Sequence, residues 1–439
     1  MMRLLPILAV LVSPLLQAAE TLPEPLTLDV ALEQASRPDH YEILLAEAER
    51  QKSAAEAEAQ RAENELTLDL EGRWRKVGLS DNSPLSDDDD SLAGLYLRKP
   101  LYDFGRSAAA ETLAEHKLRL SELQKQWRIR QRELKIVELY YQVLDADNEF
   151  LRHNEELAIG FIRYDRMREN RDLGLASDID VEEKLAAYEL IRQNRYRSEN
   201  RQRLTRQLLA EALGYPDSPP DELAVPEIDT ERSLPEVDVL MQQAMRSSPR
   251  IGISRQQVEI ARQAIRQAEK ADRPQLDAEL EVAKHFRDNS TRDDWRASIY
   301  FDVPLYRASS ADARLRQARA GHRKALAELD RTRSELRVEI LKLWQQLRQS
   351  RLRLQGALAA EEYRDLYLDR SRADYELEFK SDLGDAMVQF SDARWKVWRA
   401  RFDFDLAWRK LETLVGAELE TLAGDGAQSN PDPSGDANG

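Results

Sequence analysis

The side chains that most often perform catalysis or hold a metal ion are present in this sequence, but they are not arranged for either task. None of the five histidines has a second histidine at the spacing of metal ligands. The chain has no cysteine, which excludes disulfides, thiolate zinc sites and catalytic thiols. No phosphate-cradling glycine loop, nucleophile-elbow serine or dinucleotide fingerprint occurs. We therefore expect no enzymatic activity, no cofactor and no metal site.

Charge patterning gives little support to a binding site of its own. The run Asp87 to Asp90 is dense in carboxylates, but it lacks the alternating ligand spacing and the glycine turn of a calcium loop, so a solvated loop is the more common structure for such a run. The formal charge of −16 argues against a nucleic-acid partner, because the phosphates would be repelled. Charged residues make up 33% and apolar residues 42% of the chain, which indicates a core spread over long amphipathic elements.

The N-terminal residues have the character of a secretory signal. Arg3 is followed by a short apolar run, residues 4–16, and then by small residues at positions 18 and 19. The run is shorter than the roughly 20 residues that a membrane-spanning helix needs. We therefore expect residues 1–19 to be a signal peptide, and the exported protein to be periplasmic, secreted or an outer-membrane β-barrel.

Most of the chain is predicted to form two long helices. From Ser107 to about Arg171 there is no proline and only one glycine, and a second stretch without proline runs from about Ala308 to Tyr375. Apolar residues recur every seven positions, which predicts coiled-coil packing. About 65 helical residues at 1.5 Å each give a rod of roughly 100 Å. The repeating positions are Leu113, Leu120, Trp127, Leu134 and Tyr141 in the first stretch, and Leu329, Leu336 and Leu343 in the second.

The two halves of the chain repeat the same order of elements. Pro100-Leu101-Tyr102 returns as Pro304-Leu305-Tyr306, and Ser177-Asp178 returns as Ser381-Asp382, both at an offset of 204 residues. We therefore expect a first repeat, a proline-rich linker, a second repeat, and a tail. The first repeat spans 20–213, with strands 65–77 and 92–102 and a helical hairpin 105–213, and the linker spans 214–238. The second repeat spans 239–416, with strands 275–286 and 294–306 and a helical hairpin 308–416. The tail spans 417–439 and is expected to be disordered from 424.

Four short segments alternate with a period of two instead of the helical period. Leu66, Leu68 and Leu70, for example, are separated by polar residues, and each segment spans about ten residues, the length of a membrane-spanning strand. Four strands alone would leave unpaired edges in lipid, so closure requires several chains. Three chains would give twelve strands around a wet lumen. The lumen candidates are Asp69, Glu71, Arg73, Asp277, Glu279, Glu281 and Arg296, whose acidic majority favours cations.

These elements carry a resemblance to a known family. The signal peptide, the two copies of strand, strand and helical hairpin, and the segments 100–106 and 174–181 resemble the TolC-like outer-membrane efflux proteins over Leu26 to Leu422. The resemblance implies a mainly α fold with a small β part: helical hairpins that form an α-barrel, and four strands per chain in a 12-stranded trimeric transmembrane β-barrel. It also implies that the proline-rich linker 214–238 is an equatorial girdle around the tunnel's waist, to which a plain connection is the alternative.

The same resemblance implies a function and a set of partners. The chain would be a passive exit duct of a tripartite efflux or type I secretion system, in the outer membrane of a Gram-negative bacterium and reaching into the periplasm. It would form a homotrimer in contact with outer-membrane lipid. A periplasmic adaptor (membrane fusion protein) would open it, and an inner-membrane pump of RND, ABC or MFS type would supply the energy.

The resemblance also assigns roles to the two hairpin turns. Residues at these turns would dock the adaptor, and others nearby would form the periplasmic gate. Glu378 stands where a glycine is usual, and Gly384 aligns with an expected aspartate, so the second turn departs from the pattern. The docking residues would be Gly174, Leu175, Ala176, Ser177, Asp180, Val181, Phe379, Ser381 and Leu383. The gate residues would be Tyr375, Lys380, Asp382 and Asp385, the two aspartates being either a selectivity ring or plain surface charges.

A second hypothesis is a periplasmic coiled-coil adaptor or scaffold without a membrane pore. Such a protein also carries a helical hairpin, but usually a single one. The two hairpins and four alternating strands of this chain favour the duct.

Overall fold

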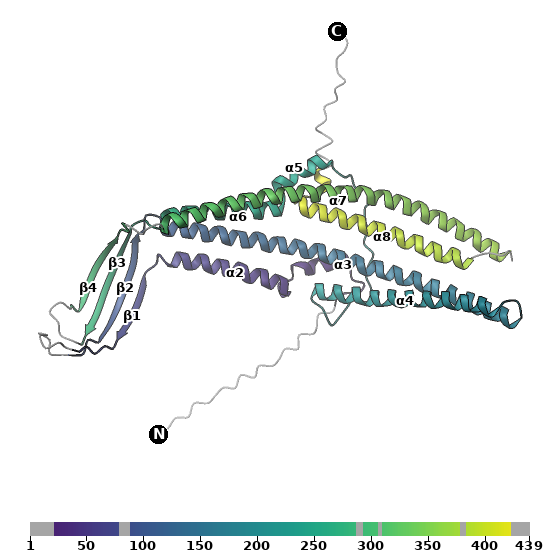
Figure 1. Ribbon diagram of the computed structural model, residues 1–439, viewed down its shortest axis with the longest axis horizontal. Helices are drawn as coiled ribbons and strands as arrows, with labels where there is room; N and C mark the ends of the chain where they lie inside the picture. Colours follow the sequence, from purple (N-terminus) through teal and green to yellow (C-terminus); the bar gives the residue numbers. More distant parts are fainter. Residues whose placement is uncertain (1–21, 79–87, 287–292, 306–309, 378–382, 423–439) are drawn as a thin grey trace, which may run out of the picture. The chain divides into compact units, whose positions relative to one another are not determined.

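The computed structural model describes residues 22–78, 88–286, 293–305, 310–377 and 383–422. Most of them are helical, and four strands form one sheet, so the predicted mainly α class with a small β part is confirmed (Figure 1). The elements are α1 (Leu28–Glu33), η1 (Gln34–Ser36), α2 (Tyr41–Ala62), β1 (Thr67–Arg73), β2 (Leu92–Tyr102), α3 (Arg106–Asp172), α4 (Asp178–Leu213), α5 (Val237–Ser247), α6 (Pro249–Lys270), β3 (Gln275–His285), β4 (Trp295–Asp302), α7 (Ser310–Glu376) and α8 (Leu383–Val415).

Several sequence-based expectations fall outside the described residues: the signal peptide 1–19, the tail from 424, Asp87 and the turn 378–382. Among the helices that are described, none combines the length and the apolar character needed to cross a membrane.

The chain divides into two compact units, and each of them contains segments of both repeats. The tip unit holds the hairpin helices near their turns, and the sheet unit holds the β-sheet with the helices beside it. The tip unit comprises the described residues of Met1–Ala35, Lys135–Ile228 and Leu354–Phe402, and the sheet unit those of Ser36–Leu134, Asp229–Arg353 and Asp403–Gly439.

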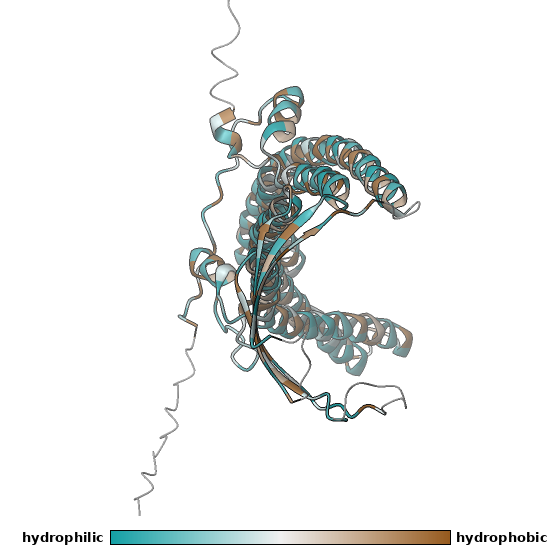
Figure 2. Ribbon diagram, turned by 90° about the vertical axis from the view of Figure 1, so that its left-hand side faces the viewer, coloured by the Kyte–Doolittle hydropathy of each residue, from teal (hydrophilic) through white to brown (hydrophobic). Residues whose placement is uncertain are grey.

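The sheet is antiparallel with the strand order β1-β2-β3-β4. The central pair joins the two repeats, since β2 belongs to the first and β3 to the second. Leu95 pairs with both Leu70 and Val282, so the apolar residues of neighbouring strands share a face. Figure 2 shows apolar and polar residues following one another along these strands. Strand β1 ends at Arg73, short of the predicted 77, although an isolated bridge pairs Lys76 with Asp89.

The sequence after β2 forms a tight turn that starts α3. Asp103 accepts hydrogen bonds from the backbone N–H of Gly105 at 3.0 Å and of Ser107 at 2.6 Å. Burial acts to raise the pKa of Asp103, but the hydrogen bonds from Ser107 and Gly105 outweigh it, and the pKa is lowered. Phe104 and Gly105 both have positive φ, at 55° and 81°. The turn therefore connects β2 to α3 within three residues and provides the first helical turn with an anionic cap.

The proline-rich linker is held at both of its ends. In the tip unit, Leu26 forms a parallel bridge with Leu223, and the Tyr140 hydroxyl donates to the carbonyl of Leu26 at 2.7 Å. Burial raises the pKa of this phenol. In the sheet unit, the indole N–H of Trp344 donates to the carbonyl of Pro235 at 3.0 Å. The segment thus has specific anchors in each unit.

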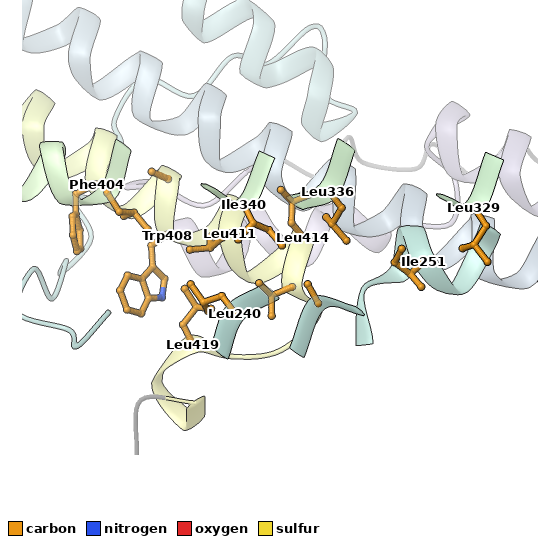
Figure 3. Packing of buried hydrophobic residues seen from close by; sticks show 14 residues of the cluster. Leu240, Ile251, Leu329, Leu336, Ile340, Phe404, Trp408, Leu411, Leu414 and Leu419 are labelled. Carbon is orange, nitrogen blue, oxygen red and sulfur yellow. The ribbon is translucent and has the colours of Figure 1, made fainter. Parts of the chain in front are cut away.

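The core of the sheet unit lies where α7 and α8 meet the short helices α5 and α6. Leu336 of α7 is fully buried, as the seven-residue spacing predicts, and so is Ile340 one turn further along. Leu411 and Leu414 of α8 lie beside them (Figure 3). Leu240 of α5 lies close to Leu419 in the same cluster. The remaining members are Ala244, Ile251, Leu329, Leu347, Phe404, Ala407, Trp408 and Val415.

We expect Ile340→Ala to lower the free energy of unfolding by about 2–5 kcal/mol, and Ile340→Val by about 0.5–1.5 kcal/mol, because Ile340 is fully buried and the cavity grows with the volume removed. Urea unfolding of the purified protein in detergent measures both changes. Equal, small effects of the two variants would contradict a close-packed core at this position.

Candidate functional site

One face of the sheet carries the predicted lumen residues. The register aligns Asp69 of β1 with Tyr96 of β2, Tyr96 with Glu281 of β3, and Glu281 with Arg296 of β4. Because side chains alternate between faces along a strand, all seven lumen candidates lie on this same face. The opposite face carries the leucines and other apolar residues.

The charges on this polar face are paired across strands. Arg98 of β2 donates to Glu279 of β3 at 2.6 Å and lies 3.5 Å from Asp69 of β1, so one guanidinium joins three strands. The Tyr300 hydroxyl donates to Glu279 at 3.2 Å. Arg296 lies 3.8 Å from Glu281. The face is therefore a compensated network and not a row of free carboxylates.

Arg98 is a residue that the list of lumen candidates missed. The signal was available, because Arg98 occupies a polar position in the alternation of its strand. Its two partners could not be foreseen, since they depend on the register of β2 against both neighbours.

The first hairpin turn, between α3 and α4, presents apolar side chains to solvent. Gly174 has φ 74°, and the backbone N–H of Leu175 donates to the carbonyl of Asn170 at 2.8 Å, which closes the C-terminus of α3. Leu175 is 76% and Ile179 80% exposed. Val181 is buried instead, so within this chain it supports the turn and offers no contact surface.

A capping box fixes the start of α4. The Ser177 hydroxyl accepts from the backbone N–H of Asp180 at 3.3 Å, and the Asp180 carboxylate accepts from the backbone N–H of Ser177 at 2.8 Å. The hydrogen bonds from the hydroxyl and the backbone of Ser177 lower the pKa of Asp180. The predicted docking residues Ser177 and Asp180 therefore shape the turn, while Gly174, Leu175 and the half-buried Ala176 lie between the two helices.

The second hairpin turn is described only in part. Phe379, Lys380, Ser381 and Asp382 lie outside the described residues, as does Glu378. The structure describes Tyr375, which is exposed at the end of α7, and Leu383, which is half-buried at the start of α8.

The structure explains why a glycine stands at position 384. A Cβ atom there would lie 2.8 Å from the Cγ2 atom of Ile159 on α3. A side chain at position 384 would therefore require the Ile159 side chain or the α8 backbone to shift. The next residue, Asp385, forms an ion pair with Arg163, so its carboxylate is not free.

This ion pair is the outermost member of a series of polar contacts that we call the α3–α8 ladder. Further from the turn, Glu155 accepts a hydrogen bond from the Ser391 hydroxyl. The Arg152 guanidinium lies 3.8 Å from Asp392. At the innermost rung, the indole N–H of Trp395 donates to Asp145 at 2.9 Å, and Arg201 of α4 donates to the same carboxylate at 2.7 Å. The ladder joins the two hairpins of one chain.

No group of three or more histidine, aspartate or glutamate side chains in the described part of the chain is arranged to hold a metal ion.

Comparisons with known proteins show which family model and which solved structures resemble this chain. Residues 240–417 match a family model described as outer membrane efflux protein. The outer membrane protein VceC from Vibrio cholerae is 16% identical with a TM-score of 0.69, over 89% of this chain and 96% of that one. The CmeC outer membrane channel of Campylobacter jejuni is 14% identical with a TM-score of 0.72, over 93% of this chain and 90% of that one.

A third solved structure has the same fold. It is the open state of the MtrE outer membrane channel of Neisseria gonorrhoeae, 14% identical with a TM-score of 0.69, over 89% of each chain. Among curated protein sequences, none matches this chain.

The fold is that of outer-membrane channels that combine long helices with a small sheet. Part of the chain matches the outer membrane efflux protein family model, and the resemblance to the TolC-like proteins inferred from the sequence is confirmed. The predicted outer-membrane location agrees with that family, and the scaffold hypothesis finds no support.

We expect Arg98→Gln to increase the preference of the pore for cations, because it removes the positive charge that compensates Asp69 and Glu279. The reversal potential in a salt gradient measures this preference. The neighbouring Lys99→Gln is the matched control, since Lys99 lies on the opposite face of the same strand and its loss should leave the reversal potential unchanged. Equal shifts in both variants would contradict the assignment of faces.

Proposed function

We propose that the protein is a passive outer-membrane exit duct that functions as a homotrimer. The observation that carries this proposal is the sheet, which has one continuous apolar face and one charged face across both repeats. Within the chain, β1 and β4 each pair on one side only, so two strand edges require partners. Three copies that join edge to edge would close a barrel of twelve strands, with the apolar face toward lipid and the charged face toward water.

The route through such a duct would be controlled at the hairpin turns. The α3–α8 ladder becomes more buried with distance from the turns. Arg163 and Asp385 are 47% and 43% exposed, whereas the Asp145 side chain is only 11% exposed. Exposed ion pairs contribute only about 0.2–1 kcal/mol each, so the outer rungs are easily broken. The inner rung is better shielded and is shared with Trp395 and Arg201. We infer that opening separates the hairpins from the turns inward and stops near Asp145.

A periplasmic adaptor would drive this opening from the turns. The exposed apolar side chains Leu173, Leu175 and Ile179 of the first turn offer a surface for its docking. Binding there would favour the separated hairpins only if the adaptor contacts that state more strongly than the closed one. An inner-membrane pump would supply the energy, as the resemblance to the TolC-like proteins implies.

The duct proposal is tested by the location and the conductance of the purified protein. We expect recovery in the outer-membrane fraction, resistance to salt extraction, and single-channel currents in planar bilayers, because a closed barrel is held by its apolar face. Recovery in the soluble periplasm, or a membrane-bound protein without currents at any voltage, would overturn the proposal.

The ladder is tested by exchanging the charges of its outer rung. Arg163→Asp and Asp385→Arg each place like charges together, so we expect either variant to increase the open probability in planar bilayers. The double variant restores an attractive pair with reversed polarity, and we expect it to return to the wild-type open probability. Currents that follow neither pattern would separate this ion pair from the gate.

A further inference from the structure

The apolar face of the sheet carries two lysines. Among the described strand residues of this face, Lys99 of β2 and Lys284 of β3 are the only charged ones, and both are exposed. Their neighbours on the face are Leu68, Leu70, Ala93, Leu95, Leu97, Leu276, Ala278, Leu280, Val282, Trp295, Ala297, Ile299 and Phe301. A charge on a lipid-facing position is unfavourable unless its side chain can reach the membrane surface.

The two lysines occupy equivalent places in the central strand pair. Lys99 pairs with Ala278, and Lys284 pairs with Ala93, so each lysine lies opposite an alanine of the partner strand. A small residue at that position leaves the lysine stem free to bend along the sheet. The same lysine–alanine pair therefore occurs near both ends of the β2–β3 pair.

Their separation fits the thickness of an outer membrane. In register, the two positions are six residues apart, which is about 20 Å along the strands at about 3.3 Å per residue. A strand tilt of about 40° reduces this to about 15 Å across the membrane. Each lysine stem reaches about 6 Å further outward when it bends toward the surface. The two ammonium groups would then lie about 27 Å apart, close to the apolar band of about 25 Å in outer-membrane barrels.

Aromatic side chains mark the end at which Lys284 lies. Trp74, Phe286 and Trp295 are 88%, 58% and 66% exposed, and they adjoin the strand ends away from the helices. Such aromatic residues are typical of the interface between lipid tails and headgroups. Lys99 lies near the opposite end, where β2 leads into α3. The two lysines therefore belong to different leaflets.

We propose that Lys99 and Lys284 each bind the phosphate of a lipid headgroup, one in each leaflet, and that these two contacts fix the depth of the barrel in the membrane. The ammonium group is a compact point charge that suits a phosphate. The proposal rests on the proposed function, because it requires the sheet to span the membrane.

Native mass spectrometry of the detergent-solubilised full-length protein tests the proposal. Phosphatidylglycerol is the probe, a phosphate-free glycolipid of the same acyl chains is its control, and inorganic phosphate distinguishes a free anion from a lipid. We expect the wild type to retain phosphatidylglycerol at least several-fold better than the glycolipid. The Lys99→Gln/Lys284→Gln double variant should lose that difference. The conservative Lys99→Arg/Lys284→Arg variant should keep it.

Arg98→Gln is the matched control, since it removes a base from the polar face of the same strand and should not change lipid retention. Retention that is equal for both lipids, equal in wild type and double glutamine variant, or abolished by millimolar inorganic phosphate alone would overturn the proposal. Currents in planar bilayers are recorded from the same samples. Normal currents without selective lipid retention reject only the phosphate sites, whereas absent currents reject the duct itself.

Discussion

The antiparallel pairing of β2 with β3 is the interaction on which the rest of the structure depends. It joins the two repeats in one sheet, and its register places Leu95 opposite Val282 and Tyr96 opposite Glu281. A slip by one residue would turn the apolar set of one repeat toward the polar face of the other. The pairing also leaves β1 and β4 as edges. Each unpaired backbone group in lipid costs several kcal/mol, so the proposed duct requires further copies of the chain at these edges.

Helix α3 starts directly after the sheet. Strand β2 ends at Tyr102 and α3 begins at Arg106, so only a short turn separates them. The carboxylate of Asp103 and the positive φ of Phe104 and Gly105 fix that turn in one conformation. A flexible connection would let the helix rotate about its axis and would misalign the heptad positions. A rigid turn instead keeps the apolar seam directed at the neighbouring helices over many turns.

The sequence predicted those features that depend on local periodicity. Alternation by two and recurrence by seven report the period of the secondary structure directly, so the strands and long helices could be foreseen within a few residues. Features set by distant partners could not. The ion pairs of Arg98 depend on strand register, the glycine at position 384 depends on Ile159, and the burial of Val181 depends on how the hairpin closes. Helix α5 begins at the end of the predicted linker. Its place in the fold depends on the apolar cluster of the sheet unit, to which it contributes Leu240 and Ala244.

The two faces of the sheet use different basic residues for a physical reason. Arg98 on the polar face contacts carboxylates on two neighbouring strands, a geometry that a planar guanidinium with several donors can satisfy while remaining close to the sheet. Lys99, the next residue along the chain, lies on the apolar face, where it pairs with Ala278 of β3. A long flexible stem with one terminal charge is the better side chain there, because the charge can leave the apolar layer while the stem stays in it. Arginine at position 98 thus suits the charged polar face, and lysine at position 99 suits the apolar face.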